Sequence, residues 1–259
     1  MAENGYTPEE MMAVMAARQI ENGQRCFVGI GLPSTAANLA RLTHAPDVIL
    51  IYESGTIGAK PSVLPLSIGD GELAETADTV VSVPEIFAYW LQSGRIDVGF
   101  LGAAQLDRYG NINTTVIGPY DAPKVRLPGA GGAPEIAAAA REVFIMVRHG
   151  KRAFVDKLDF VTSVGRGQGN GATAATGAGP TRIITDLAML TPDPKTNEFT
   201  LTTLYPGVTV DRVKDATGWE LKVADRLDEP APPTEIELTA LRELQARTAR
   251  AHAAPIGQA

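Results

Sequence analysis

The sequence predicts an α/β protein with an open, mostly parallel sheet flanked by helices in Rossmann-like layers. Short apolar runs of strand length recur along the chain, and segments with helical spacing lie between several of them. Residues 26–30 and 48–52 are the clearest runs, and each is almost continuously apolar, as strands covered on both faces of a sheet are. Strands that alternate with helices in this way indicate parallel pairing.

Helix signals appear near both ends of the chain. Thr7-Pro8 supplies an N-cap hydroxyl and a proline at the first helical position, and Glu10 can complete a capping box. Ser34 is expected to cap a second helix that runs to Leu42. Further helices are predicted by their spacing and flanking residues at 86–92, 134–141 and about 234–250.

Four further strands are predicted, over residues 98–101, 143–147, 161–164 and 183–185. The stretch 165–180 is rich in Gly, Ala and Thr and shows no periodicity, so we expect a mobile surface loop there. With no internal repeat and no clear linker, residues 1–259 are expected to form a single domain with a frayed C-terminal tail.

Composition excludes several classes of protein. A hydrophobic content of 44% is too high for a disordered chain, and a net charge of −7 argues against a protein that binds a nucleic acid backbone. The single cysteine, Cys26, lies in an apolar run and rules out an intrachain disulfide or a cysteine-cluster metal site. The N-terminus does not resemble a signal peptide, so a cytoplasmic location is expected.

Glu53 is the first candidate for chemistry. It follows the apolar run 48–52 and precedes Ser54-Gly55, so it leaves the buried sheet where the chain turns. Open α/β sheets bind their ligands at the carboxyl ends of strands, which favours a functional carboxylate at this position. An acid that caps a helix or stabilises a turn is the alternative, and position alone leaves both open.

A glycine-rich loop at residues 127–133 is the second candidate. Gly131 and Gly132 come directly before the predicted helix 134–141, and their backbone N–H groups could form a cradle for an oxyanion or a phosphate. A flexible connector is the alternative, because the loop matches neither the Walker loop nor the dinucleotide fingerprint.

Several separated segments, in order, resemble the B subunits of the class I CoA-transferases. They are residues 26–33 (CFVGIGLP), 51–55 (IYESG), 100–107 (FLGAAQLD), 110–115 (GNINTT) and 127–133 (LPGAGGA). Residues 65–73 (PLSIGDGEL) and 90–97 (WLQSGRID) are more similar to the subgroup that acts on 3-oxoadipate than to the glutaconate subgroup. The resemblance extends from about residue 5 to residue 250.

The resemblance implies a ping-pong reaction through a glutamyl-CoA thioester, with succinyl-CoA as the donor and 3-oxoadipate as the acceptor. Glu53 matches the family's nucleophile and Gly132 its oxyanion-hole amide, with Gly131, Ser54 and Gly55 beside them. It also implies that the reaction needs no cofactor or metal, since the CoA thioester is itself a substrate. A CoA-transferase A subunit of similar fold is the implied partner in a hetero-oligomer, and neither nucleic acid nor a membrane is expected as a partner.

Other polar segments receive a structural interpretation. Residues 107–113 lack the spacing of a calcium loop and are expected to form a turn whose Asn side chains bond to local backbone. Solvent-facing charges are expected at Lys124, Arg126, Lys151 and Arg152. Ser34 and Ser163 lack the nucleophile-elbow pattern of a serine hydrolase.

Three functions remain in view at this stage. The first is the transferase that acts on 3-oxoadipate. The second is a relative on the same scaffold: a transferase for glutaconate or another dicarboxylate, an acyl-CoA hydrolase, or a decarboxylase. The third is a binding subunit without catalytic activity. The Glu53-Ser54-Gly55 pattern favours a transferase, because a merely structural subunit gains nothing from an acid at that strand end.

Overall fold

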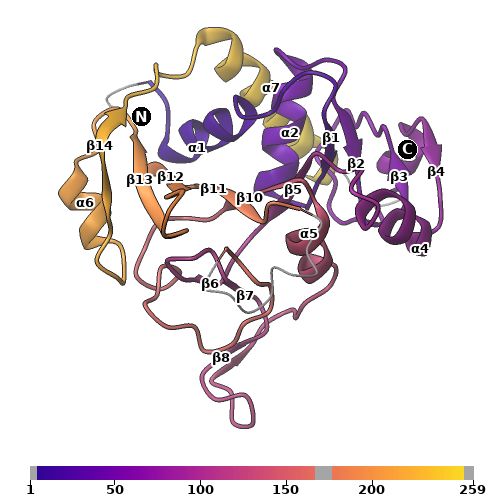
Figure 1. Ribbon diagram of the computed structural model, residues 1–259. Coiled ribbons are helices and arrows are strands. Elements are labelled where there is room, and N and C mark those ends of the chain that lie inside the picture. Colours follow the sequence, from indigo (N-terminus) through magenta and orange to yellow (C-terminus); the bar gives the residue numbers. More distant parts are fainter. Residues whose placement is uncertain (1–4, 167–176, 254–259) are drawn as a thin grey trace. The chain divides into compact units, whose positions relative to one another are not determined.

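The computed structural model describes residues 5–166 and 177–253, and Figure 1 shows its ribbon. The chain divides into two compact units. Unit 1 consists of Met1–Ile86 together with Pro233–Ala259, and unit 2 consists of Phe87–Pro232. The expectation of one domain over residues 1–259 stays a prediction, and the two units are described in turn.

Unit 1 contains four short strands in the order β1-β2-β3-β4. They are β1 (Arg25–Phe27), β2 (Ile49–Ile51), β3 (Thr56–Ile57) and β4 (Thr79–Val80). The pair β1–β2 is parallel, whereas β2–β3 and β3–β4 are antiparallel. Strand β1 ends at Phe27, earlier than predicted, although the Val28 amide still donates to the Ile51 carbonyl at 2.8 Å.

Three helices of unit 1 pack against one another (Figure 1): α1 (Pro8–Ala17), α2 (Leu32–Leu42) and α7 (Glu235–Ala253). Two short helices, α3 (Gly71–Glu75) and α4 (Val83–Glu85), complete the unit. Helix α1 begins with the predicted capping box, because Thr7 Oγ1 accepts the Glu10 amide and Glu10 Oε2 accepts the Thr7 amide. Every residue of α1 after Glu9 is buried, so this helix forms part of the core.

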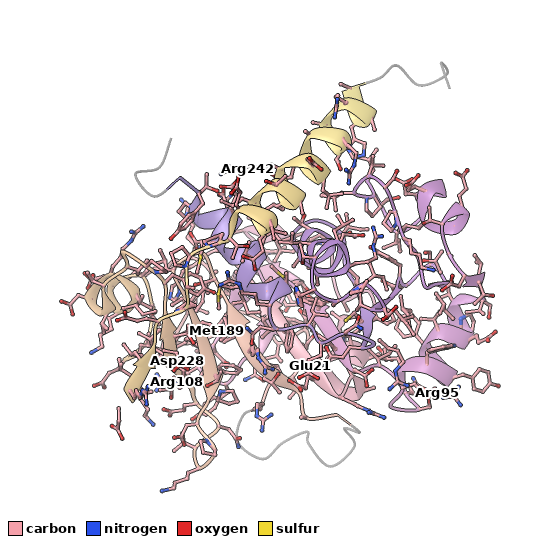
Figure 2. The ribbon with its side chains drawn as sticks, turned by 90° about the horizontal axis from the view of Figure 1, so that it is seen from above. Glu21, Arg95, Arg108, Met189, Asp228 and Arg242 are labelled. Carbon is pink, nitrogen blue, oxygen red and sulfur yellow. The ribbon has the colours of Figure 1, made fainter. Side chains whose placement is uncertain are left out.

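Ion pairs hold α7 on α1. Arg242, labelled on α7 in Figure 2, binds both carboxylate oxygens of Glu10, at 2.7 and 3.1 Å. Arg18 makes a similar forked contact with Glu237 at 2.7 and 2.8 Å. The hydrogen bond from Arg242 lowers the pKa of Glu10 below its usual value, although burial opposes the shift. Since only Leu241 and Leu244 of α7 are buried, these pairs matter for its attachment.

The larger sheet in unit 2 is formed by six strands in the order β14-β13-β12-β11-β10-β5. They are β5 (Val98–Leu101), β10 (Glu142–Met146), β11 (Pro180–Ile184), β12 (Ala188–Pro192), β13 (Phe199–Leu204) and β14 (Val223–Asp228). Strands β5, β10 and β11 run parallel, and β12 pairs antiparallel with β11 and with β13. The pair β13–β14 is again parallel.

Helices and small hairpins surround this sheet. Helix α5 (Ala133–Ala139) packs on β5, and α6 (Val210–Asp215) connects β13 to β14. Strand β6 (Gln105–Leu106) pairs with β7 (Ile112–Asn113), and β8 (Val116–Ile117) pairs with β9 (Val125–Arg126). The loop between β8 and β9 projects from its unit in Figure 1. The predicted helix 86–92 is a π-helix over Ile86–Leu91.

The predicted α/β class, with a mostly parallel central sheet and flanking helices, is confirmed. The predicted strand 161–164 is wrong, because only Ser163 pairs, in an isolated bridge with Ile112. There the Thr162 hydroxyl accepts the Thr114 amide at 2.9 Å, so a side chain replaces a ladder bond. Most of the predicted loop 165–180 lies outside the described residues. In the described parts of the chain, no helix is long and apolar enough to cross a membrane.

Candidate active site

Glu53 lies at the tip of the tight turn between β2 and β3 in unit 1. The amide of Tyr52 donates to the Thr56 carbonyl at 3.1 Å, and the amide of Gly55 donates to the Tyr52 carbonyl at 3.0 Å. These bonds leave Glu53 and Ser54 as the partly exposed residues of a turn whose other members are buried. The sequence places the acid there because the apolar run of β2 ends one residue earlier, at the fully buried Tyr52.

Gly55 fixes the path of this turn. Its φ of 107° is a conformation that side chains with a Cβ rarely adopt. The Gly55 carbonyl accepts the Val81 amide at 2.9 Å, which joins the turn to the segment after β4. A Cβ at position 55 would lie 1.9 Å from the Val81 carbonyl oxygen, so only glycine fits.

The polar side chains of the turn have few partners. Within the described residues, the Glu53 carboxylate makes no hydrogen bond or ion pair, which leaves it available to a substrate. The Ser54 Oγ and the Thr56 Oγ1 are buried, again with no hydrogen-bond partner in that part of the chain. Buried hydroxyls are normally paired, so two unpaired ones beside an accessible acid are typical of a functional site.

Only one of the two residues after Glu53 has a free amide in this turn. The Ser54 amide has no carbonyl acceptor among the described residues. The Gly55 amide is not free, because the turn itself uses that donor in the bond to Tyr52. Gly55 therefore serves the site through its shape, and its N–H cannot also face an oxyanion without opening the turn.

The glycine-rich loop belongs to unit 2 and is held from one side. The Gly129 amide donates to the Thr114 carbonyl at 2.9 Å, and the Thr114 hydroxyl donates to the Gly129 carbonyl at 2.8 Å. Gly132 is the buried N-cap residue of α5, and Gly131 is exposed with a φ of 49°. In the described chain, neither the Gly131 nor the Gly132 amide donates to a protein carbonyl, so both N–H groups can face a ligand.

A pocket of unit 2 opens at the carboxyl ends of the parallel strands β5 and β10. Its volume is about 590 Å³, and it is lined by the residues that follow each strand: Gly102, Ala103, and residues 146–153. This is the position where open α/β sheets hold ligands. Arg148, Lys151 and Arg152 are exposed at this pocket, and Lys124 and Arg126 are likewise exposed on their hairpin.

His149 is a partly buried polar residue that the sequence did not single out. Its Nδ1 lies 3.2 Å from Thr185 Oγ1 and its Nε2 lies 2.9 Å from Thr217 Oγ1, and its ring stacks on Phe154 at 3.8 Å. Burial lowers the pKa of His149 to about 4, with the charge of Asp186 opposing the shift. The ring is therefore neutral at pH 7 and links Thr185, directly after β11, to Thr217, shortly after α6.

The turn at residues 107–113 has the predicted character at Asn113, whereas the Asn111 side chain bonds to the Asp107 carboxylate and to the amide of the distant Gly165. The Asp107 carboxylate accepts the amides of Tyr109 and Asn111, and the Asn113 side chain accepts the amides of Thr115 and Val116. These acceptors are occupied by local backbone, as expected of a turn and not of a calcium loop. The described residues contain no group of three or more His, Cys, Asp or Glu side chains that could hold a metal ion.

A family model described as Coenzyme A transferase matches residues 9–216. The chain belongs to this family. Across 252 residues it is 65% identical to the B subunit of 3-oxoadipate CoA-transferase from Pseudomonas knackmussii, covering 96% of this chain and 97% of the relative. The resemblance stated from the separated sequence segments is thereby confirmed.

Two more distant relatives bear on the alternatives. The crystal structure of glutaconate coenzyme A-transferase from Acidaminococcus fermentans superposes with a TM-score of 0.86 at 36% identity, covering 93% of this chain and 95% of that one. The cholesterol ring-cleaving hydrolase IpdB subunit of Rhodococcus jostii is 30% identical over 224 residues, covering 82% of this chain and 81% of the relative. Relatives of this chain therefore include transferases and hydrolases, and its sequence identity is higher to the 3-oxoadipate and glutaconate transferases than to this hydrolase.

Proposed function

We propose that this chain is the B subunit of a 3-oxoadipate CoA-transferase, which moves CoA from succinyl-CoA to 3-oxoadipate in the degradation of aromatic compounds. The observation that carries the proposal is Glu53, an accessible carboxylate without a protein partner among the described residues, at the tip of the β2–β3 turn. The 65% identity to the Pseudomonas knackmussii protein supports this substrate over glutaconate, because the corresponding glutaconate CoA-transferase polypeptide is 39% identical over 243 residues.

Glu53 opens the reaction as a carboxylate nucleophile. It attacks the thioester carbon of succinyl-CoA, the C–S bond breaks, and CoA leaves as a thiolate from a succinyl-glutamyl anhydride. The thiolate then attacks the Glu53 carbonyl of the anhydride, succinate leaves, and a glutamyl-CoA thioester remains. In the second half, 3-oxoadipate attacks this thioester, and the released thiolate attacks the 3-oxoadipyl carbonyl, which frees Glu53. Covalent catalysis of this kind divides one difficult exchange into easier steps.

Each attack creates a negatively charged oxygen that needs hydrogen-bond donors. The free amides of Gly131 and Gly132, together with the Ser54 amide and its unpaired hydroxyl, are our candidates for this role. One such donor contributes roughly 3 kcal/mol to a transition state of this type. A carboxylate nucleophile requires no general base, so the neutral, partly buried His149 is not needed for proton transfer.

A CoA-transferase A subunit is the proposed partner. In the proposed hetero-oligomer it completes the substrate site and supplies contacts to the distal carboxylate of the acid. We further propose that the reaction uses no cofactor and takes place in the cytoplasm. Purified without the A subunit, this chain is expected to transfer essentially no CoA.

The test is to co-express the chain with the A subunit encoded beside it and to assay transfer from succinyl-CoA to a panel of dicarboxylic and 3-oxo acids. We expect 3-oxoadipate to be the preferred acceptor. The Glu53→Gln variant, which keeps the shape of the side chain, should lose roughly a thousandfold or more of the rate. A preference for glutaconate would support the alternative transferase, and CoA release to water without an acceptor would support the hydrolase.

A further inference from the structure

Tyr52, the residue directly before Glu53, carries a buried hydroxyl. It has no exposed surface, and its hydroxyl oxygen lies 3.1 Å from the equally buried Oγ of Ser34 on α2. Desolvation by burial raises the pKa of the Tyr52 phenol, and hydrogen bonds from Ser34 and Asn38 oppose the shift only in part. A phenylalanine would fill the same space without a buried hydroxyl, so the hydroxyl calls for an explanation.

The contact continues as a chain of hydrogen bonds along one face of α2. The Asn38 side-chain nitrogen Nδ2 donates to the Ser34 backbone carbonyl at 2.9 Å and lies 3.4 Å from the Ser34 Oγ. Arg41 donates to the Asn38 side-chain oxygen through Nε and Nη2, at 3.3 and 3.1 Å. Ser34, Asn38 and Arg41 stand at helical spacings of four and three, which is what places them on one face.

The far end of this chain returns to the segment that leaves the hairpin. Arg41 Nη2 donates to the Pro61 carbonyl at 2.8 Å, and Pro61 follows β3 by four residues. This series of hydrogen bonds thus connects two segments to helix α2: Tyr52, which enters the Glu53 turn, and the segment at Pro61 that follows the hairpin. Desolvation lowers the pKa of Arg41 from a very high ordinary value, so its guanidinium remains charged and its bonds remain charge-assisted.

We propose that Tyr52 is a positioning residue for CoA transfer, which holds the turn that carries Glu53 in one orientation through Ser34, Asn38 and Arg41. The inference rests on the proposed function. The carboxylate of Glu53 first attacks the thioester, and its carbonyl carbon is then attacked by the CoA thiolate and later by the acceptor acid. One fixed position of the side chain must therefore serve successive attacks. Small displacements of a reacting group cost large factors in rate, which is why a rigid support matters here.

The test uses the complex with the A subunit and the variants Tyr52→Phe and Ser34→Ala. Tyr205→Phe is the matched control, because Tyr205 is also a buried tyrosine and its hydroxyl has no partner in the described chain. We measure single-turnover formation of the glutamyl-CoA thioester over a range of succinyl-CoA concentrations, and urea unfolding of each variant. Both Tyr52→Phe and Ser34→Ala should lower the saturating rate about tenfold, with the half-saturating concentration unchanged.

The double variant Tyr52→Phe/Ser34→Ala should be no slower than the slower single variant, because both changes remove the same hydrogen bond. Tyr205→Phe should leave the rate unchanged. A folded Tyr52→Phe complex with the wild-type rate would overturn the proposal, and so would a loss explained entirely by the unfolded fraction. If Tyr52→Phe does not fold, the same two results in Ser34→Ala decide the matter. The proposed function fails separately, by an absence of Glu53-dependent transfer in the wild-type complex.

Discussion

Replacing Gly55 by alanine tests how the turn that carries Glu53 is built. Gly55 has a φ of 107°, and the Cβ of an alanine would lie 1.9 Å from the Val81 carbonyl oxygen. That oxygen belongs to backbone and cannot rotate aside as a flexible side chain could. The turn must therefore move away from the segment after β4, and the 2.9 Å bond from the Val81 amide to the Gly55 carbonyl is lost or lengthened.

The expected loss of stability has two parts. A residue with a Cβ at positive φ costs about 1–2 kcal/mol. The lost backbone hydrogen bond adds about 1 kcal/mol, and the backbone movement that avoids the collision adds a further cost. Gly55→Ala should therefore lower the free energy of unfolding by about 2–4 kcal/mol. Urea unfolding of the isolated chain measures this value, and transfer by the complex with the A subunit should fall because Glu53 is displaced with the turn.

Gly23→Ala is the matched control, because Gly23 has a φ of 80° and no atom within 4 Å of an added Cβ. It should cost about 1–2 kcal/mol, which is the cost of the left-handed conformation alone, and leave transfer unchanged. If the free energies of unfolding of the two variants differ by less than about 0.5 kcal/mol and both transfer CoA equally well, the proposed role of Gly55 in the turn is wrong.

Three further outcomes are expected. The pKa of His149 is about 4 in the folded chain and near 6.5 in the unfolded chain, so the unfolded state binds more protons between these pH values. The free energy of unfolding should therefore fall by about 3 kcal/mol as the pH drops from 6.5 to 4. Urea unfolding of His149→Asn should lack that part of the pH dependence. Arg242→Met should raise the pKa of Glu10, measured by NMR titration, and cost no more than about 1 kcal/mol of stability, since the Arg242 side chain is half exposed. Tyr205→Phe should leave the melting temperature unchanged or raise it, because it removes a buried hydroxyl that has no partner in the described chain; a clear drop would show that the hydroxyl is satisfied.

The sequence predicted the strands whose burial is continuous. Strands β2 and β5 lie within apolar runs, and β10 does so after its first residue, because both faces of such strands are covered; this pattern is visible without a structure. The same reasoning located Glu53, since an acid directly after such a run must leave the sheet as the chain turns. Its partners could not be located in this way, because the hydrogen bonds of the turn depend on segments distant in the sequence.

The antiparallel half of unit 2 was missed although a signal exists. Strand β13 alternates buried and partly exposed residues: Phe199, Leu201 and Thr203 are buried, whereas Thr200, Thr202 and Leu204 are partly exposed. That period of two is the mark of a strand with one covered face, which a search for continuous apolar runs overlooks. The wrong strand at 161–164 is the opposite error, since valines at both ends of the segment are about half exposed.

The support beneath Glu53 also had a sequence signal that was not used. Ser34, Asn38 and Arg41 are polar residues at helical spacing on a helix whose other faces are largely apolar. Their spacing predicts a shared face, but only the structure shows that this face meets Tyr52 and Pro61. Tyrosine in an apolar run reads equally well as a packed aromatic, so its hydroxyl partner could not be inferred from sequence.

The most direct measurement is to trap the covalent intermediate. The complex with the A subunit is mixed with succinyl-CoA and then with borohydride, which reduces a glutamyl thioester to an alcohol, and the digested chain is read by mass spectrometry. The predicted result is one reduced residue, Glu53, which forms only when succinyl-CoA is present. The reduced residue should be absent when excess 3-oxoadipate is added after succinyl-CoA and before borohydride. Reduction at another residue, or none in a complex that transfers CoA, would contradict the central role of Glu53.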